Sequence, residues 1–271
     1  MKILVLAPYY PHRDDSFSGI FNERCVATLS ELCDSVEVLV PRPYAPPVLS
    51  SLVPRWKAYS KIVGYEVRNG IPVYRPTYLQ IPRVRRAFWI DPAAFYWCRH
   101  AARKMHRRVR FDAIVSFDLI GVGGIAWRMG QDLGIPASGW AVGGDVRFSA
   151  TSSYGQALLQ AIKHLDLVFY QSYELLEKVA ELLRVSPHQM SPCEHVVLPR
   201  GVPEPPSLSR GESRNRLRAE WRISNNQIVV LTIGRIVRDK GIFELLNAIS
   251  LAASRDPRIM CVLVGSQPAF D

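Results

Sequence analysis

The sequence predicts an α/β fold, in which helices cover both faces of a mainly parallel sheet. Short apolar segments alternate with amphipathic segments from residue 1 to residue 198, as in strands joined by helical crossovers. A Pro-rich stretch at 201–209 interrupts this alternation, which then starts again. The hydrophobic fraction of 48% and the charged fraction of 21% are typical of a folded protein. These observations predict two α/β units joined by a linker.

The first unit, residues 1–202, is expected to contain short strands rich in Val, Ile and Leu. Asn69-Gly70 lies between two alternating segments and predicts a hairpin over Gly64–Pro76. Ser18 is placed to cap the first helix. The expected strands are Lys2–Ala7, Ser35–Val40, Phe111–Phe117, Ile135–Val142, Asp166–Tyr170 and His195–Leu198, and the expected helices are Gly19–Cys33, Pro92–Arg110, Val122–Leu133, Tyr154–His164 and Tyr173–Leu183.

The second unit is expected over residues 213–271, after a linker at 203–212. Its predicted elements are the helix Ser213–Trp221, the strand Gln227–Ile233, the helix Asp239–Ser254 and the strand Ile259–Val264. A two-stranded parallel sheet has bare edges and little core. We therefore expect a fragment, with a complete first unit and only the opening strand–helix–strand part of the second.

Targeting and cysteine patterns both indicate a cytoplasmic protein. No apolar run reaches the roughly 18 residues that span a bilayer, and the opening MKILVLAPYY is too short for a signal peptide. The five cysteines are scattered, without C-x-x-C pairs or histidines at zinc-site spacing. We therefore expect reduced thiols and no metal site.

The net charge of +10 is concentrated in one stretch of the chain. Ten Lys or Arg and one acid, Asp91, lie between Arg75 and Arg110. Such a basic field favours an anionic partner, and we expect contact with an anionic membrane surface rather than nucleic acid, since no nucleic-acid recognition module is visible. The alternative is a solvated helix face whose Ala, Cys and Met side packs on the sheet. The residues expected to face the membrane are Arg83, Arg85, Arg86 and Trp89.

A candidate anion site follows the first strand of the second unit. The strand runs into Gly234-Arg235, and Asp239-Lys240-Gly241 comes at the start of the next helix. Ligands of such sheets bind beyond the carboxyl ends of the strands, and a helix N-terminus offers unpaired amides. Arg235 and Lys240 could hold a diphosphate from two directions. The alternative is an ordinary strand–helix turn with solvated charges.

A second glycine-rich segment supports a rival hypothesis. Gly121–Ala126 fits the G-x-G-x-x-A pattern of dinucleotide-binding proteins, with Asp145 some twenty residues further on. It follows an internal strand, and Asp118–Ile120 separate that strand from the glycine. A loop that lets a helix pack close to the sheet explains the same pattern.

The chain resembles the GT-B glycosyltransferases of family 4. Gly234–Gly241 matches their G-R-x-x-x-x-K-G signature, and Leu198–Val202 is similar to their P-N-G-V segment, with Arg200 in place of Asn. The resemblance implies that Arg235 and Lys240 contact the diphosphate of a UDP- or GDP-linked sugar. Gly234 and Gly265 belong to the same phosphate-binding loops, although Gln267 replaces the second glycine of the family's G-x-G-P segment.

The resemblance also extends to the first unit. Val142–Val146 is similar to the family's H-G-x-D-V loop, which lies by the donor sugar and the acceptor, but Val142 stands where many members have His. Asp145 is the catalytic candidate, with a helix cap or an Asx turn as its alternative role. His12 is a weaker candidate, because a lone loop histidine is usually just exposed. The residues implied for this acceptor and donor-sugar loop are Gly19, Gly143, Gly144 and Asp145.

The resemblance implies two Rossmann-like domains and hexosyl transfer from a nucleotide sugar to a hydroxyl acceptor. Transfer would retain the anomeric configuration and need no metal or cofactor, and the product would be a cell-surface polysaccharide or glycolipid. The family's E-x7-E pair would lie beyond Asp271, so we expect poor transfer by these residues alone. Two alternatives remain, an NAD(P)-binding oxidoreductase that uses Gly121–Ala126 and a non-catalytic sugar- or lipid-binding remnant.

Overall fold

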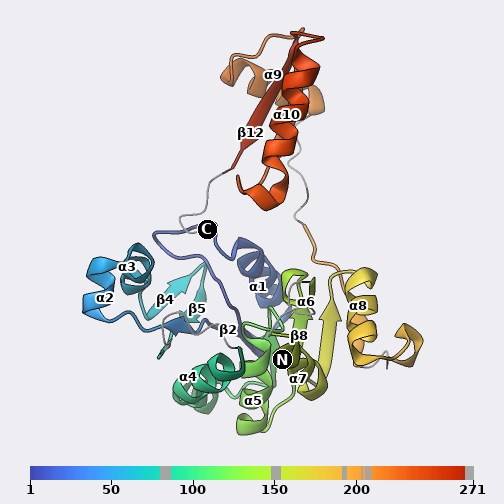
Figure 1. The fold of residues 1–271 in the computed structure, drawn as a ribbon. Helices are drawn as coiled ribbons and strands as arrows, with labels where there is room; N and C mark the ends of the chain where they lie inside the picture. Colours follow the sequence, from blue (N-terminus) through green and yellow to red (C-terminus); the bar gives the residue numbers. More distant parts are fainter. Residues whose placement is uncertain (80–86, 148–153, 191–193, 203, 205–208, 266–271) are drawn as a thin grey trace. The chain divides into compact units, whose positions relative to one another are not determined.

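The computed structural model describes residues 1–79, 87–147, 154–190, 194–202, 204 and 209–265. The chain divides into two compact units, Met1–Val202 and Pro203–Asp271. Each unit is an α/β structure (Figure 1).

Unit 1 is built on an eight-stranded sheet with the order β10-β9-β8-β7-β1-β2-β5-β4. Every neighbouring pair is parallel except β4 and β5, which form the hairpin predicted around Asn69-Gly70. Both residues of that turn have positive φ, as a two-residue hairpin turn requires. The strands are β1 (Lys2–Leu6), β2 (Ser35–Leu39), β4 (Tyr65–Arg68), β5 (Ile71–Tyr74), β7 (Ala113–Ser116), β8 (Ala137–Ala141), β9 (Leu167–Tyr170) and β10 (His195–Val197).

Helices cover both faces of this sheet, because successive side chains of a strand point to opposite faces. Leu4 and Leu6 of β1 belong to a core cluster that contains the buried residues of α4 (Ala87–Val109), α5 (Gly123–Leu133), α7 (Gly155–His164) and α8 (Tyr173–Leu183). Ile3 and Val5 belong to a second cluster, which contains Val26 of α1 (Ile20–Leu32). The alternation predicted from the sequence is therefore present, with all these strand residues 3% exposed or less.

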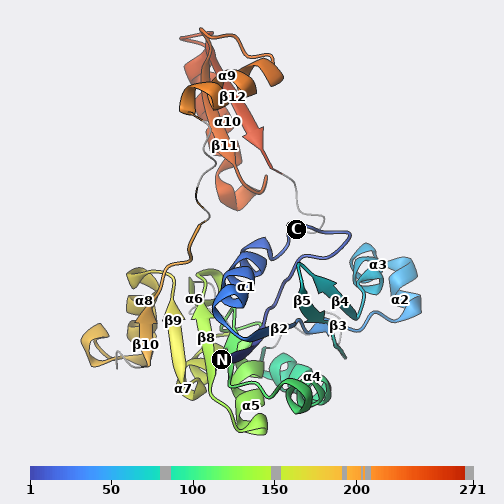
Figure 2. The same cartoon turned by 180° about the vertical axis from the view of Figure 1, so that it is seen from behind.

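One part of unit 1 is absent from the sequence prediction. Between β2 and β4 the chain leaves the sheet and forms two short helices, α2 (Pro47–Leu52) and α3 (Pro54–Lys61). Figures 1 and 2 both show these helices beside each other at the β4 end of the sheet. A separate two-stranded ladder joins β3 (Arg42–Pro43) to β6 (Thr77–Tyr78). Short α6 (Gly144–Arg147) and the 3-10 turn η1 (Pro187–Gln189) were also not predicted.

Unit 2 contains two parallel strands, β11 (Ile228–Ile233) and β12 (Ile259–Val264). They pack with α9 (Arg210–Glu220), the 3-10 turn η2 (Arg238–Lys240) and α10 (Ile242–Ala253). The buried hydrophobic residues described in this unit are Ile223, Val237 and Ile242. The unit therefore has a much smaller core than unit 1.

Three predicted helix starts are wrong. The N-cap of α1 is Gly19, not Ser18. Helix α4 begins at Ala87, five residues before the predicted Pro92, which lies inside the helix. Helix α9 begins at Arg210 inside the segment expected to be linker, because Ser209 and Glu212 form a reciprocal capping box.

The packing of α5 on β8 predicts a sensitive glycine. A Cβ atom at Gly130 would lie 2.8 Å from the backbone oxygen of Ile135 and 3.0 Å from Cβ of Ala137. Alanine is favoured over glycine in a helix by about 1 kcal/mol, but backbone cannot yield as a side chain can. We expect Gly130→Ala to lower the free energy of unfolding by about 1–3 kcal/mol, measured by urea denaturation.

Gly134, which ends the same helix, is the control. A Cβ atom there would meet nothing within 4 Å, and its φ of 69° is one that Asn adopts readily. Gly134→Asn should change stability by less than about 1 kcal/mol. Equal losses in the two variants would contradict the packing argument.

Candidate functional site

The loops that can form a site in unit 1 meet at one edge of the sheet. Strand β1 lies between β2 and β7, so the direction of strand succession reverses at this point. Parallel α/β sheets bind their ligands in the crevice at such a reversal, outside the carboxyl ends of the strands. The loops after β1, β7 and β8 all open at this edge.

Close backbone contact shapes the loop that joins β1 to α1. Gly19 has a φ of 78°, and a Cβ atom there would lie 2.4 Å from the backbone oxygen of Tyr9. Only glycine fits this position without moving the backbone. The Asn22 side chain, 6% exposed, donates from Nδ2 to the same Tyr9 oxygen over 2.8 Å. Both contacts bring the start of α1 against the residues that follow β1.

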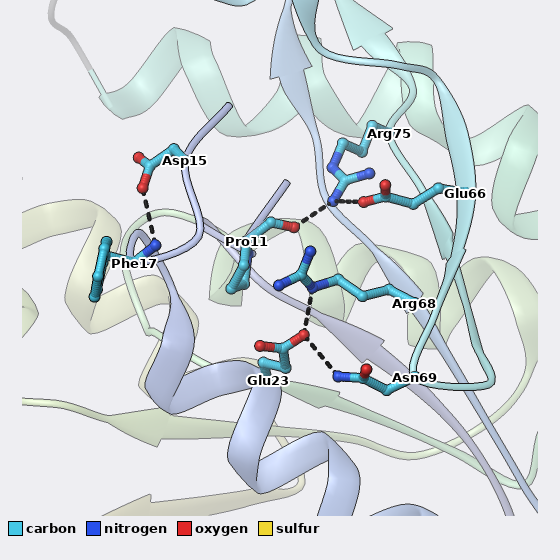
Figure 3. A network of polar contacts seen from close by, with 8 residues as sticks. All are labelled: Pro11, Asp15, Phe17, Glu23, Glu66, Arg68, Asn69 and Arg75. Carbon is cyan, nitrogen blue, oxygen red and sulfur yellow. Dashed lines mark hydrogen bonds and ion pairs between the residues drawn. The ribbon is translucent and has the colours of Figure 1, made fainter. Parts of the chain in front are cut away.

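Ion pairs attach this loop and α1 to the β4–β5 hairpin (Figure 3). Arg75 is 3% exposed, pairs with Glu66 over 2.7 Å and donates from Nη2 to the backbone oxygen of Pro11 over 2.8 Å. Glu23 of α1 pairs with Arg68 and accepts a hydrogen bond from the Asn69 side chain. The loop is therefore supported from the hairpin side by charges that are largely withdrawn from water.

Asp145 connects the loops that follow β7 and β8. It is 6% exposed, and its carboxylate accepts hydrogen bonds from the backbone amides of Leu119, Val142, Gly143 and Val146 over 2.9–3.2 Å. Burial is the largest influence on this carboxyl and raises its pKa, while the four amides act in the opposite direction. These contacts give Asp145 a positioning role, because its oxygens are directed at backbone and not at open space.

A second carboxylate, Asp118, lies beside it. Its Oδ1 accepts a hydrogen bond from the Gly121 amide. Burial first and the neighbouring Asp145 second raise the pKa of Asp118 to about 7. Dinucleotide-binding proteins bind a diphosphate with the amides of the glycine-rich loop and of the helix start that follows it. Here the Gly121 amide, at the beginning of that loop, already donates to Asp118. The contact argues against the oxidoreductase alternative based on Gly121–Ala126.

Arg200 is the residue of this edge that sequence reasoning missed. Its Nη2 donates to Asn22 Oδ1 over 3.1 Å, and its guanidinium lies 5.5 Å from the ring centres of both Phe117 and Trp140. It thus links the end of β10 to α1, β7 and β8. The only signal in the sequence was its departure from the P-N-G-V pattern, and no local pattern predicts a contact across 178 residues.

In unit 2 the glycines of the two predicted phosphate loops touch each other. A Cβ atom at Gly265, after β12, would lie 1.8 Å from the backbone oxygen of Gly234, which follows β11. The amide of Gly234 also donates to the carbonyl of Val264 over 2.9 Å. Any side chain at position 265 would displace the backbone after the neighbouring strand, so this edge stays clear only with glycine.

Two cations and a helix start lie between these two glycines in the chain. The side chains of Arg235 and Lys240 are exposed. Lys240 ends the turn η2, and α10 starts two residues later with Gly241 at the N-cap. Gly241 has no side chain that could accept hydrogen bonds from the amides of the first turn, which are the groups that bind anions at helix starts.

The predicted site residues therefore fall into two groups. Gly19 and the loop of Gly143, Gly144 and Asp145 lie at the carboxyl edge of the unit 1 sheet, and Gly234, Arg235, Lys240 and Gly265 lie at the corresponding edge of unit 2. His12 contacts its own loop, where its Nδ1 accepts from the Asp14 amide over 3.3 Å. In the described ranges, no three His, Cys, Asp or Glu side chains come together as metal ligands would.

The expected membrane-facing residues are not placed. Arg83, Arg85, Arg86 and Gln267 lie outside the described residues, as does the side chain of Trp89. Further along α4, Arg103 forms a two-point ion pair with Asp132 of α5. Part of the basic face of α4 is therefore directed at the protein. No helix in the described part of the chain is long and apolar enough to span a bilayer.

Comparisons with known proteins identify several glycosyltransferases that are similar to this chain. Residues 213–271 match the family described as "Glycosyl transferases group 1". The chain is 28% identical over 271 residues to a Bacillus subtilis (strain 168) protein named as the teichuronic acid biosynthesis glycosyltransferase TuaC. Anabaena HepE, solved in complex with UDP and glucose, is similar with a TM-score of 0.60 at 16% identity. Sucrose-phosphate synthase from Thermosynechococcus elongatus is similar with a TM-score of 0.63 at 16% identity.

These matches show that the chain has a fold like that of the GT-B glycosyltransferases, and that its residues 213–271 are similar to the group 1 glycosyltransferases. The match to TuaC covers 99% of this chain and 66% of that protein. The matches to HepE and sucrose-phosphate synthase cover 99% and 100% of this chain, and 62% and 64% of those chains. The chain thus spans about two thirds or less of the length of these relatives.

The carboxylate pair predicts how stability depends on pH. Because the pKa of Asp118 is raised to about 7 in the folded state, ionising it costs stability, and this cost appears as the pH rises from about 4 to about 7. Asp118→Asn cannot ionise, so its stability relative to the unmodified chain should increase by about 1–3 kcal/mol over that range. Urea denaturation at pH 5, 6, 7 and 8 measures this difference.

Asp256→Asn is the control, because hydrogen bonds from Arg258 lower the pKa of the Asp256 carboxyl to about 2. The carboxyl is therefore ionised throughout, and the stability of this variant relative to the unmodified chain should stay constant from pH 5 to 8. A flat difference for Asp118→Asn as well would show that the Asp118 carboxyl is not held in its neutral form by burial.

Proposed function

We propose that the protein transfers a hexosyl group from a nucleoside diphosphate sugar to a hydroxyl acceptor in the synthesis of a cell-surface polysaccharide or glycolipid. The family match over residues 213–271 and the similarity to TuaC support glycosyl transfer and a cell-surface product. HepE was solved with UDP and with UDP-glucose, which supports a UDP-linked donor. A GDP-linked donor would fit the same diphosphate chemistry.

The contact between Gly234 and Gly265 is the observation that carries this proposal. The two loop backbones that contain these glycines lie at one edge of the unit 2 sheet. The loop after β11 also contains two exposed cations and leads into the start of α10. Arg235 and Lys240 would bind the donor diphosphate and stabilise the negative charge that develops on it as the sugar leaves. Gly234, Gly265 and the amides of α10 would surround the same phosphates.

The acceptor would bind at the carboxyl edge of unit 1. There Asp145 and Asp118 hold the loops after β7 and β8, and Gly19 lets the loop after β1 approach closely. Because carboxylates already occupy many backbone amides at this edge, it suits a neutral hydroxyl better than a second phosphate. Retention of configuration and independence of metal or other cofactor follow from the family resemblance and form part of the proposal.

A paired substitution tests the donor site. Arg235→Ala/Lys240→Ala removes two charge-assisted contacts worth about 1.5–3 kcal/mol each, so the dissociation constant of UDP-sugars should rise by about 100-fold or more. Isothermal titration calorimetry with UDP, UDP-glucose and GDP-mannose measures the binding, and the donor that binds best is then used for turnover.

Arg255→Ala/Arg258→Ala is the control, because it removes two cations that precede β12, at the opposite edge of the same two-stranded sheet. Binding should be unchanged in this variant. Nucleotide-sugar binding that is equally tight in both double variants would refute the proposed donor site.

A further inference from the structure

The chain between β2 and β4 has an unusual charge pattern. Glu37 and Glu66 are consecutive acids in the sequence, so residues 38–65 contain none. The same stretch contains four basic residues, Arg42, Arg55, Lys57 and Lys61. It includes α2 and α3. We call residues 47–63 the α2–α3 hairpin, which comprises these two helices and ends at Val63.

Large apolar side chains of this hairpin are exposed. Val48 and Leu52 are 70% and 73% exposed, and their i, i+4 spacing puts them on one face of α2. Val53 and Val63 are also exposed. A single exposed apolar residue is ordinary, but four within 16 residues of one surface segment indicate a contact surface.

Lysines accompany these apolar residues. Lys57 and Lys61 are exposed and have the same i, i+4 spacing on α3. Burying two ammonium groups in an apolar protein interface is unfavourable, and so is leaving the side chains of Val48 and Leu52 in water. The interface of an anionic bilayer satisfies both, because it offers acyl chains for the apolar groups and phosphates for the lysines.

Contacts with the β3–β6 ladder attach the hairpin to unit 1. Arg42 Nη1 donates to the backbone oxygen of Tyr59 in α3 over 2.8 Å, and its Nε donates to that of Arg75 over 3.3 Å. The amides of Arg42 and Tyr44 pair with Pro76 and Tyr78 over 3.0 and 2.8 Å. The hairpin is thus attached to the β4–β5 side of unit 1 through backbone groups, and its apolar residues remain at the surface.

We propose that the α2–α3 hairpin is a membrane-contact surface that binds anionic phospholipid. The proposal does not depend on the sugar-transfer reaction, because the hairpin belongs to unit 1 and the proposed donor site to unit 2. It also differs from the membrane surface expected at Arg83–Trp89, which the described residues do not include. The hairpin would bring the carboxyl edge of unit 1 to lipid that carries an acceptor.

Vesicle co-sedimentation tests the proposal without any nucleotide sugar. The chain should bind vesicles of equal phosphatidylglycerol and phosphatidylcholine, bind pure phosphatidylcholine at least tenfold more weakly, and be released by 0.5 M NaCl. Lys57→Gln/Lys61→Gln should lower the partition coefficient on anionic vesicles by about tenfold or more. Leu52→Asp should lower it by a similar factor, because it places a charge in the apolar contact.

Matched variants control for charge and apolarity elsewhere. Leu32→Asp changes a leucine that is 78% exposed at the end of α1, and Lys163→Gln/Lys178→Gln removes two charges from α7 and α8. Both should bind vesicles as the unmodified chain does. Circular dichroism checks that every variant is folded.

Two results would overturn the proposal. One is a folded chain that does not bind anionic vesicles, which would assign the hairpin to a protein partner. The other is vesicle binding that the hairpin variants and the control variants weaken equally.

Discussion

Parallel strand pairing is the constraint on which both units depend, because it brings the carboxyl ends of neighbouring strands, and the amides that follow them, to one edge. The two units treat these amides differently. In unit 1, Asp118 and Asp145 accept hydrogen bonds from the loops after β7 and β8. In unit 2, glycines fill the corresponding positions, and no side chain at Gly241 caps α10. Carboxylates of the chain itself therefore bind loop amides in the first unit, whereas the donor site proposed for the second unit would bind the phosphates of a ligand.

The basic residues near these edges also differ between the two units. Arg200 is directed inward between the rings of Phe117 and Trp140 and bonds to Asn22, so its charge serves to join β10 to α1. Arg75 is likewise buried against Glu66 and Pro11. Arg235 and Lys240 are exposed, and both lie between the two glycines in the chain. Basic residues that look alike in the sequence thus differ in burial, since Arg75 and Arg200 are withdrawn from water and Arg235 and Lys240 are exposed.

Most of the sheet could be predicted from the sequence, because buried parallel strands are apolar runs and the helices between them repeat at a regular spacing. The hairpin at Asn69-Gly70 was predicted by its turn chemistry. The α2–α3 hairpin was not, since its two helices are short and only partly apolar. The Ser209/Glu212 capping box was present in the sequence but was assigned to linker. The positioning contacts of Asp145 and Arg200 depend on residues distant in the chain, and no periodicity encodes them.

The central claim is that the glycine pair of unit 2, and not the glycine-rich start of α5 in unit 1, receives the phosphates of a nucleotide. Amide hydrogen exchange with and without UDP-glucose tests it directly, because it locates the ligand on the backbone without any substitution. The account predicts slower exchange in peptides that cover Gly234–Leu245 and Gly265, and unchanged exchange over Gly121–Ala126. Slower exchange confined to Gly121–Ala126, or none anywhere at saturating UDP-glucose, would contradict it.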